Sequence, residues 1–319
     1  MRLSGIGILL NLMLHLHAEQ LTWWAPVPRT DNARTAICLT GTKRTLHATF
    51  PQVKEVLLQH ITKISGARPD VFVVLQVDAD SRRSGRHKGI DVVDYLPVAE
   101  ELERLKRIIP GLTYVDLFDT HNDSASSFCG SYPVSQHKCC QSSEQSSLDL
   151  SREEVFGPWL SFFRARECFE QIKRREVQRG FRYESLVRLR PDLAICNGSA
   201  ARGWIGQHIF ERAVHLYHDY AWIVNRDAAS DFYDQNIGHI LAFCGNKRPD
   251  QSLLLRIGKF KKLSIRAPTD VDGLFPFVNS TLRASIETHT QYRGRDQQPA
   301  MVVVRNSSEL RRHAARCDG

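Results

Sequence analysis

Beyond its first eighteen residues, the sequence has no apolar run long enough to cross a membrane, and it contains no internal repeat. It also lacks several motifs that identify common enzymes. There is no G-x-x-x-x-G-K-[ST] phosphate loop, no G-x-S-x-G nucleophile turn, and no H-E-x-x-H or H-x-x-x-H pair among the histidines. These absences argue against a P-loop nucleotide enzyme, a serine hydrolase and a metalloprotease.

The cysteines also lack a pattern, because no two of them form a C-x-x-C pair, and this argues against a zinc site. Their even number permits disulfides in an oxidising compartment, but the spacing leaves the pairing open. The alternative is that several are free thiols in the core. The eight cysteines are Cys38, Cys129, Cys139, Cys140, Cys168, Cys196, Cys244 and Cys317.

The first residues follow the pattern of a secretory signal. Arg2 supplies a positive start, residues 6–16 are mostly apolar, and Ala18 is a small residue at a plausible cleavage point. We therefore predict that residues 1–18 are a signal peptide or a short uncleaved signal anchor, and only an anchor would hold the protein at a membrane. The predicted location is the lumen of the endoplasmic reticulum or Golgi, or outside the cell. Sequons for N-glycosylation agree with this location, at Asn122, Asn197, Asn279 and Asn306.

Composition limits the class of partner. The chain has 319 residues, of which 42% are hydrophobic and 24% charged, as in ordinary globular proteins. Its net charge of +8 favours anionic partners such as nucleotides and acidic glycans, although most of these charges belong to solvated faces. The predicted signal peptide argues against nucleic acid as the partner.

The pattern of apolar residues predicts an α/β fold. Apolar strands are expected at 35–40, 70–77, 112–118 and 184–190, with helices from residue 50, at 98–109 and at 159–180. Strands that alternate with helices indicate a mostly parallel sheet flanked by helices. The predicted organisation is a linker at 19–34, a globular domain at 35–284 with a serine- and cysteine-rich loop at 120–150, and a polar, basic tail at 285–319. Within that tail, only 301–304 resembles a strand.

Ligands of such sheets bind beyond the carboxyl ends of the strands. Arg188, Arg190 and Asp192 form the sharpest group at such an end, because residues two apart along a strand share a face. Two guanidinium groups suit phosphate oxygens, and a carboxylate beside a diphosphate can hold a divalent metal. The simpler alternative is a structural Arg–Asp pair. Gly41 and Arg44 follow the first strand, where glycine allows a ligand to approach the backbone, or where the chain simply turns into a helix.

Other acidic residues are weaker candidates. Asp78 and Asp80 form a D-x-D pair after the second strand, but the basic residues that follow favour a solvated loop. Asp227 and Asp250 each stand at a predicted helix start, where an acid suits the helix dipole or caps the helix. A catalytic base has to come from some such position, and Asp250 is our candidate.

Three segments of the chain resemble the nucleotide-diphospho-sugar transferases of the GT-A type. They read ICLTGTKRTL, PDVFVVL and YESLVRLRPDL, and the third is the most specific. The resemblance implies a Rossmann-like nucleotide-binding half and a smaller acceptor half. It places Gly41 and Arg44 beside the nucleotide, Arg188 and Arg190 near the diphosphate, and Asp192 on the metal side with Mn²⁺ or Mg²⁺. Because R-P-D replaces the usual D-x-D, the arginines are an alternative to the metal.

The function implied by the resemblance is transfer of a sugar from a nucleotide-diphosphate donor to a glycan or glycoprotein acceptor. Asp192 would act at the leaving diphosphate, and Asp250 would deprotonate the acceptor hydroxyl if the reaction inverts. Two alternatives remain open. One is a luminal sulfotransferase with a phosphoadenosine donor, which would depend on Lys43, Arg44 and Thr45. The other is a non-catalytic secreted binding protein on a degenerate transferase fold.

Overall fold

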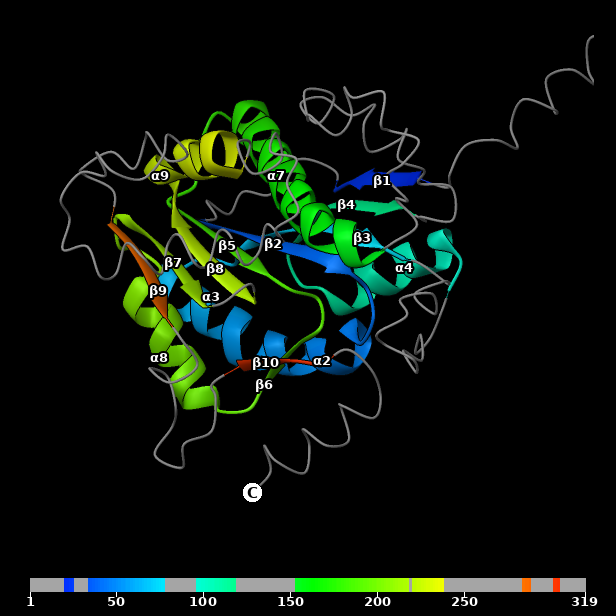
Figure 1. Cartoon of the computed structure of the whole chain (residues 1–319), viewed down its shortest axis with the longest axis horizontal. Helices are drawn as coiled ribbons and strands as arrows, with labels where there is room; N and C mark the ends of the chain where they lie inside the picture. Colours follow the sequence, from blue (N-terminus) through cyan, green and yellow to red (C-terminus); the bar gives the residue numbers. More distant parts are fainter. Residues whose placement is uncertain are drawn as a thin grey trace, which may run out of the picture.

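The structure is a computed structural model that describes residues 20–25, 34–77, 96–118, 153–217, 220–237, 283–287 and 301–304. Within these residues, eight strands form one sheet in the order β1-β4-β3-β2-β5-β8-β7-β9, and β10 pairs with β6 in a second (Figure 1). The strands are β1 Gln20–Trp24, β2 Thr35–Thr42, β3 Asp70–Gln76, β4 Leu112–Phe118, β5 Ser185–Leu189, β6 Leu193–Ile195, β7 Ala213–Tyr217, β8 Ala221–Asn225, β9 Arg283–Glu287 and β10 Met301–Val303.

Helices cover both faces of the large sheet. The longest, α7, crosses one face, whereas α2, α3 and α8 lie against the other (Figure 1). A π-helical segment at Lys54–Leu58 makes α2 continuous with α3, and another at Asp231–Ile237 follows α9. No helix among the described residues is both long enough and apolar enough to span a membrane. The helices are α2 Leu46–Val53, α3 Gln59–Ser65, α4 Val98–Ile108, α7 Glu153–Arg179, α8 Gly198–His208 and α9 Arg226–Ser230.

The sheet is mostly parallel, as the sequence predicted. Strands β4, β3, β2 and β5 run parallel, β1 and β8 are antiparallel to their neighbours, and β9 is parallel to β7. From β2 the chain moves through β3 to β4 and then returns to place β5 on the other side of β2. The order of the chain across the sheet therefore reverses between β2 and β5.

The continuous apolar strands follow from burial on both faces. Along β2, Ile37 and Leu39 join the core beneath α2, α3, α4 and α8, whereas Ala36 and Cys38 join the core beneath α7 and α9. Every residue of β3 is buried. A strand that contacts apolar layers on both sides has no solvated face, so it does not alternate between polar and apolar residues.

Two disulfides involve described cysteines. Cys38 on β2 bonds to Cys168 on α7, with their Cα atoms 6.1 Å apart. Cys196 is also disulfide-bonded, and its partner lies outside the described residues. The cysteines that the structure describes are therefore bonded rather than free.

Strand β10, from the last part of the chain that the structure describes, forms the second, two-stranded sheet with β6. Its pairing with β6 confirms the strand that we predicted there, in a segment otherwise predicted to be a polar tail. Strand β1 lies within the segment predicted to be a linker, and it pairs antiparallel with β4. Trp24 supports that pairing, because its ring packs against Tyr114 with 4.6 Å between centroids.

Several predicted features lie outside the described residues. They are the whole loop at 120–150, the D-x-D pair Asp78 and Asp80, the candidate base Asp250, and the sequons at Asn122, Asn279 and Asn306. The predicted cap Asp227 is described, and a neighbour takes that role. The side chain of Asn225 accepts the hydrogen bond from the backbone of Asp227 and so caps α9.

Candidate functional site

The candidate site lies where β2 and β5 end side by side. The two strands pair in parallel up to Leu39 and Leu189, and the chain order reverses between them. Open α/β sheets bind ligands beyond the carboxyl ends of strands at such a point. The residues of interest lie at the end of β2 and just beyond it, in 41–45, and just beyond β5, in 190–192.

Gly41 is required by the close approach of Pro191, which follows β5, to the last residues of β2. Its φ of 147° is one that other residues rarely adopt, and a Cβ atom there would lie 3.0 Å from Cδ of Pro191. The space beside Gly41 is therefore filled by the protein's own proline. The predicted role of Gly41 beside a nucleotide remains a prediction.

Replacing Gly41 with alanine is expected to reduce the free energy of unfolding by about 2 kcal/mol, since it combines an unfavourable φ with a clash against Pro191. Gly66→Ala is the matched control, because Gly66 has a φ of 72° but nothing within 4 Å of its Cβ position. It should cost about 1 kcal/mol, from the backbone alone. Urea unfolding measures both, and equal losses would show that the contact with Pro191 has no effect.

Asp192 is the centre of a buried ion-pair network. Its Oδ1 accepts a hydrogen bond from Nε of Arg190 at 2.9 Å. Its Oδ2 accepts from Nη2 of Arg190 at 2.8 Å and from Nη1 of Arg44 at 3.0 Å. Burial by itself raises the pKa of Asp192, but the charges and hydrogen bonds of Arg190 and Arg44 outweigh it and lower the pKa to about 2.

The two arginine side chains are more exposed than the carboxylate that they contact. The side chains of Arg44 and Arg190 are 19% and 16% exposed, whereas that of Asp192 is 1% exposed. Arg44 also has a φ of 38°, which is uncommon outside glycine and occurs most often at turns and functional sites. The network thus holds two partly exposed arginine side chains by hydrogen bonds to one buried carboxylate.

A second buried network borders the first. Nζ of Lys43 lies 2.5 Å from one carboxylate oxygen of Glu101, and Nε2 of His47 lies 2.8 Å from the other. Burial raises the pKa of Glu101, but the hydrogen bonds from His47 and Lys43 lower it by more, so that the pKa lies below its usual value. Sequence reasoning missed Glu101 and His47. The available signal was a glutamate among the apolar positions of α4, next to Val98 and Leu102.

Arg188 lies apart from the network of Arg190 and Asp192, although it is close to both in the sequence. It is fully buried beneath α7, where Nε donates to Oγ1 of Thr40 at 3.0 Å and Nη2 donates to Oγ of Ser161 at 2.8 Å. Its guanidinium also lies 4.3 Å from the ring centroid of Trp222. The alternation that we used applies within a strand, and β5 ends before Arg190.

Val304, which follows β10, contacts both segments of the site. The backbone N–H of Val304 donates to the carbonyl of Asp192 at 2.8 Å, and the hydroxyl of Thr45 donates to the carbonyl of Val304 at 2.5 Å. Thr45 and Lys43 therefore have partners within the protein. The sulfotransferase hypothesis needs both of these side chains to contact its donor, whereas each already has a partner within the protein.

No protein-family model and no curated protein matches the chain. The chemistry of the site therefore has to be judged from its residues. Three basic side chains, Lys43, Arg44 and Arg190, exceed the two buried acids, Asp192 and Glu101, by one positive charge. An excess of arginine charge at a strand end suits a phosphate group, which guanidinium groups bind through paired hydrogen bonds.

The same geometry does not suit a divalent cation on Asp192. Both carboxylate oxygens already accept hydrogen bonds from guanidinium groups. A metal would have to displace two positively charged, partly exposed side chains that it also repels. The metal role of Asp192 stays a prediction, and the partners of this carboxylate argue against it.

Proposed function

We propose that the protein is a glycosyltransferase of the GT-A type, which transfers a sugar from a nucleotide-diphosphate donor to a glycan or glycoprotein acceptor in the secretory pathway. One observation carries the proposal: Arg44 and Arg190 converge on Asp192 at the point where chain order reverses between β2 and β5. That point is where open α/β sheets bind nucleotides.

Arginine at this position matches the chemistry of the reaction. When the sugar leaves its donor, negative charge develops on the oxygen of the nucleoside diphosphate. Arg44 and Arg190 are oriented before the donor arrives, so they can stabilise this charge with little reorganisation. Asp192 then acts as a positioning residue, because its hydrogen bonds hold both guanidinium groups in place.

In this proposal the donor site works through arginines, and Mn²⁺ or Mg²⁺ is not assigned to Asp192. Arg188 is a second positioning residue, since its bonds to Thr40 and Ser161 fix β5 against β2 and α7. Asp250, which lies outside the described residues, remains the predicted base for the acceptor hydroxyl.

Nucleotide binding tests the proposal. We expect the secreted domain to bind a nucleoside diphosphate or its sugar, measured by calorimetry against uridine and guanosine compounds. Arg44→Ala and Arg190→Ala should each weaken that binding about tenfold or more, because each removes a charged hydrogen-bond partner of the phosphates. EDTA should leave the affinity unchanged.

Arg34→Ala is the matched control. Arg34 stands at the opposite end of β2 and also pairs with an acid, Glu184, but both side chains are 46% exposed. Its replacement should leave nucleotide affinity unchanged. Equal effects of Arg34→Ala and Arg44→Ala would contradict the proposed site. Binding of adenosine 3′,5′-bisphosphate alone would favour the sulfotransferase, and nucleotide binding without sugar transfer would favour the non-catalytic protein.

A further inference from the structure

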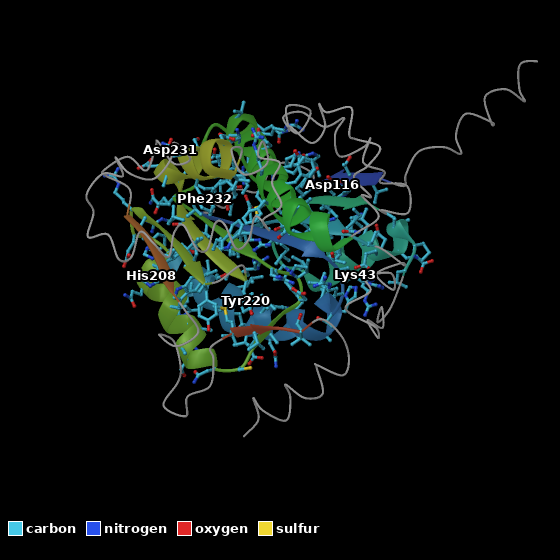
Figure 2. All side chains as sticks on the ribbon, in the orientation of Figure 1. Lys43, Asp116, His208, Tyr220, Asp231 and Phe232 are labelled. Atoms are coloured by element: carbon cyan, nitrogen blue, oxygen red, sulfur yellow. A yellow bond between two sulfur atoms is a disulfide. The ribbon has the colours of Figure 1, made fainter. Side chains whose placement is uncertain are left out.

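A second group of chemically active side chains lies away from the site described above. It consists of His208, Glu211 and His215, which come from the end of α8, the turn after it and β7. Figure 2 shows His208 and Lys43 on opposite sides of the molecule. This group therefore belongs to a different part of the fold from the arginines at the end of β2.

The backbone between α8 and β7 brings the three side chains together. The N–H of Glu211 donates to the carbonyl of His208 at 3.1 Å, and the N–H of Ala213 donates to the carbonyl of Glu211 at 2.8 Å. The hydroxyl of Ser185 at the start of β5 also donates to the carbonyl of Ile209 in the same turn. The turn is thus tied to the central sheet, and the position of Glu211 between the histidines is set by its hydrogen bonds.

The distances between ligand atoms fit one small cation. Oε2 of Glu211 lies 3.3 Å from Nδ1 of His208 and 2.9 Å from Nε2 of His215, and one ligand atom from each of the three residues lies within 4.8 Å of the other two. A tetrahedral zinc site with bonds of about 2.1 Å separates its ligand atoms by about 3.4 Å. One carboxylate oxygen already stands at nearly that distance from both imidazole nitrogens.

The chemistry and burial of the ligands favour a particular class of metal. Two imidazoles and one carboxylate suit Zn²⁺ and similar transition-metal ions, whereas Ca²⁺ and Mg²⁺ prefer oxygen ligands alone. Both histidines are buried, whereas the side chain of Glu211 is 45% exposed. A cation can therefore approach from the side of Glu211, and water can complete its coordination.

One feature has to change when a metal binds. The rings of His208 and His215 are stacked, with 3.9 Å between centroids and 21° between planes. A metal bonds to an imidazole nitrogen in the plane of the ring, so one ring has to turn about its Cβ–Cγ bond. The backbone does not have to change, because the turn that carries these residues is already formed.

We propose that His208, Glu211 and His215 form a binding site for a divalent transition-metal ion, with Zn²⁺ as the expected occupant. The site would join the end of α8 to β7 and stabilise that corner of the sheet. It is independent of the proposed transferase function. The cysteine spacing argued against a zinc site, and the motif search for histidines four residues apart missed the spacing H-x-x-E-x-x-x-H.

Metal titration of the full chain after removal of metals with EDTA tests the proposal. We expect one equivalent of Zn²⁺ to bind and to raise the unfolding temperature, and we expect Co²⁺ to give the intense visible absorption of a tetrahedral site. Glu211→Ala, His208→Gln and His215→Gln should each weaken zinc binding about 100-fold. Glu211→Ala is the principal variant, because its partly exposed position makes loss of folding less of a concern.

His60→Gln is the control, since His60 packs close to α8 at Gly206 but is outside the group. It should bind Zn²⁺ as the parent does. Three results would overturn the proposal: no zinc bound at micromolar concentration, equal binding by Glu211→Ala and the parent, or Mg²⁺ binding as tightly as Zn²⁺. Any of these would leave the group as a set of closely spaced histidine and glutamate side chains that only stabilises the turn.

Discussion

The double replacement Cys38→Ala/Cys168→Ala is expected to lower the free energy of unfolding by about 5 kcal/mol. The two cysteines are separated by 130 residues in the sequence, so their bond restricts a large part of the unfolded chain. Cross-linking a loop of that length removes more conformational entropy from the unfolded state than a short loop would. The bond also joins β2, at the centre of the sheet, to α7, which covers one face.

Urea unfolding without reducing agent measures this effect, and a second series in dithiothreitol is its control. After reduction, both the parent and the variant lack every disulfide, including the one formed by Cys196. Most of the difference between them should then disappear. A difference that persists after reduction would mean that the loss comes from packing around the two buried sulfur atoms, and a loss below about 1 kcal/mol in the first series would contradict the expectation.

Asp192→Ala is the second change with a large expected effect, a loss of about 3–5 kcal/mol in the free energy of unfolding. Asp192 is buried and accepts hydrogen bonds from Arg44 and Arg190. Its removal leaves two adjacent guanidinium groups without their shared counter-charge, in a place that water reaches poorly. Glu184→Ala is the matched control, because Glu184 and Arg34 form an exposed pair at the other end of the same strands. It should cost less than about 1 kcal/mol.

The same carboxylate predicts a dependence on pH. The pKa of Asp192 is lowered from 3.8 to about 2 in the folded protein, so the folded state binds the proton less readily than the unfolded state. Its contribution, about 2 kcal/mol, is present above pH 4 and is lost as the pH falls toward 2. The difference in unfolding free energy between the parent and Asp192→Asn should shrink over this range. A constant difference between pH 6 and pH 2 would contradict this.

The local elements of the fold were largely predictable from the sequence. The strand at 112–118 was predicted with the bounds that the structure has, and α7 ends before Gly180, whose φ is 64°. Continuous apolar runs and a glycine at a helix end have local physical causes, so they can be read without knowing the fold. Strand β1 was not predicted, because the prolines at 26 and 28 are typical of a linker.

The candidate site was predictable only in part. Arg44, Arg190 and Asp192 were named from the sequence, and the structure brings all three together. Arg188 was placed with them because residues two apart share a face of a strand, but the strand ends first and Arg188 is buried under α7. Glu101 was missed because its partners lie 54 and 58 residues away in the sequence.

The sequence by itself determined where the central strands and the helices beside them form, and that they build an α/β sheet, since apolar periodicity depends on neighbours along the chain. Only the tertiary structure decided that β5 returns beside β2, that Cys38 bonds to Cys168, and that Asp192 is held by two arginines. Each of these depends on which side of the sheet a connection takes. That choice is made by packing between distant segments, and the spacing of residues along one segment does not encode it.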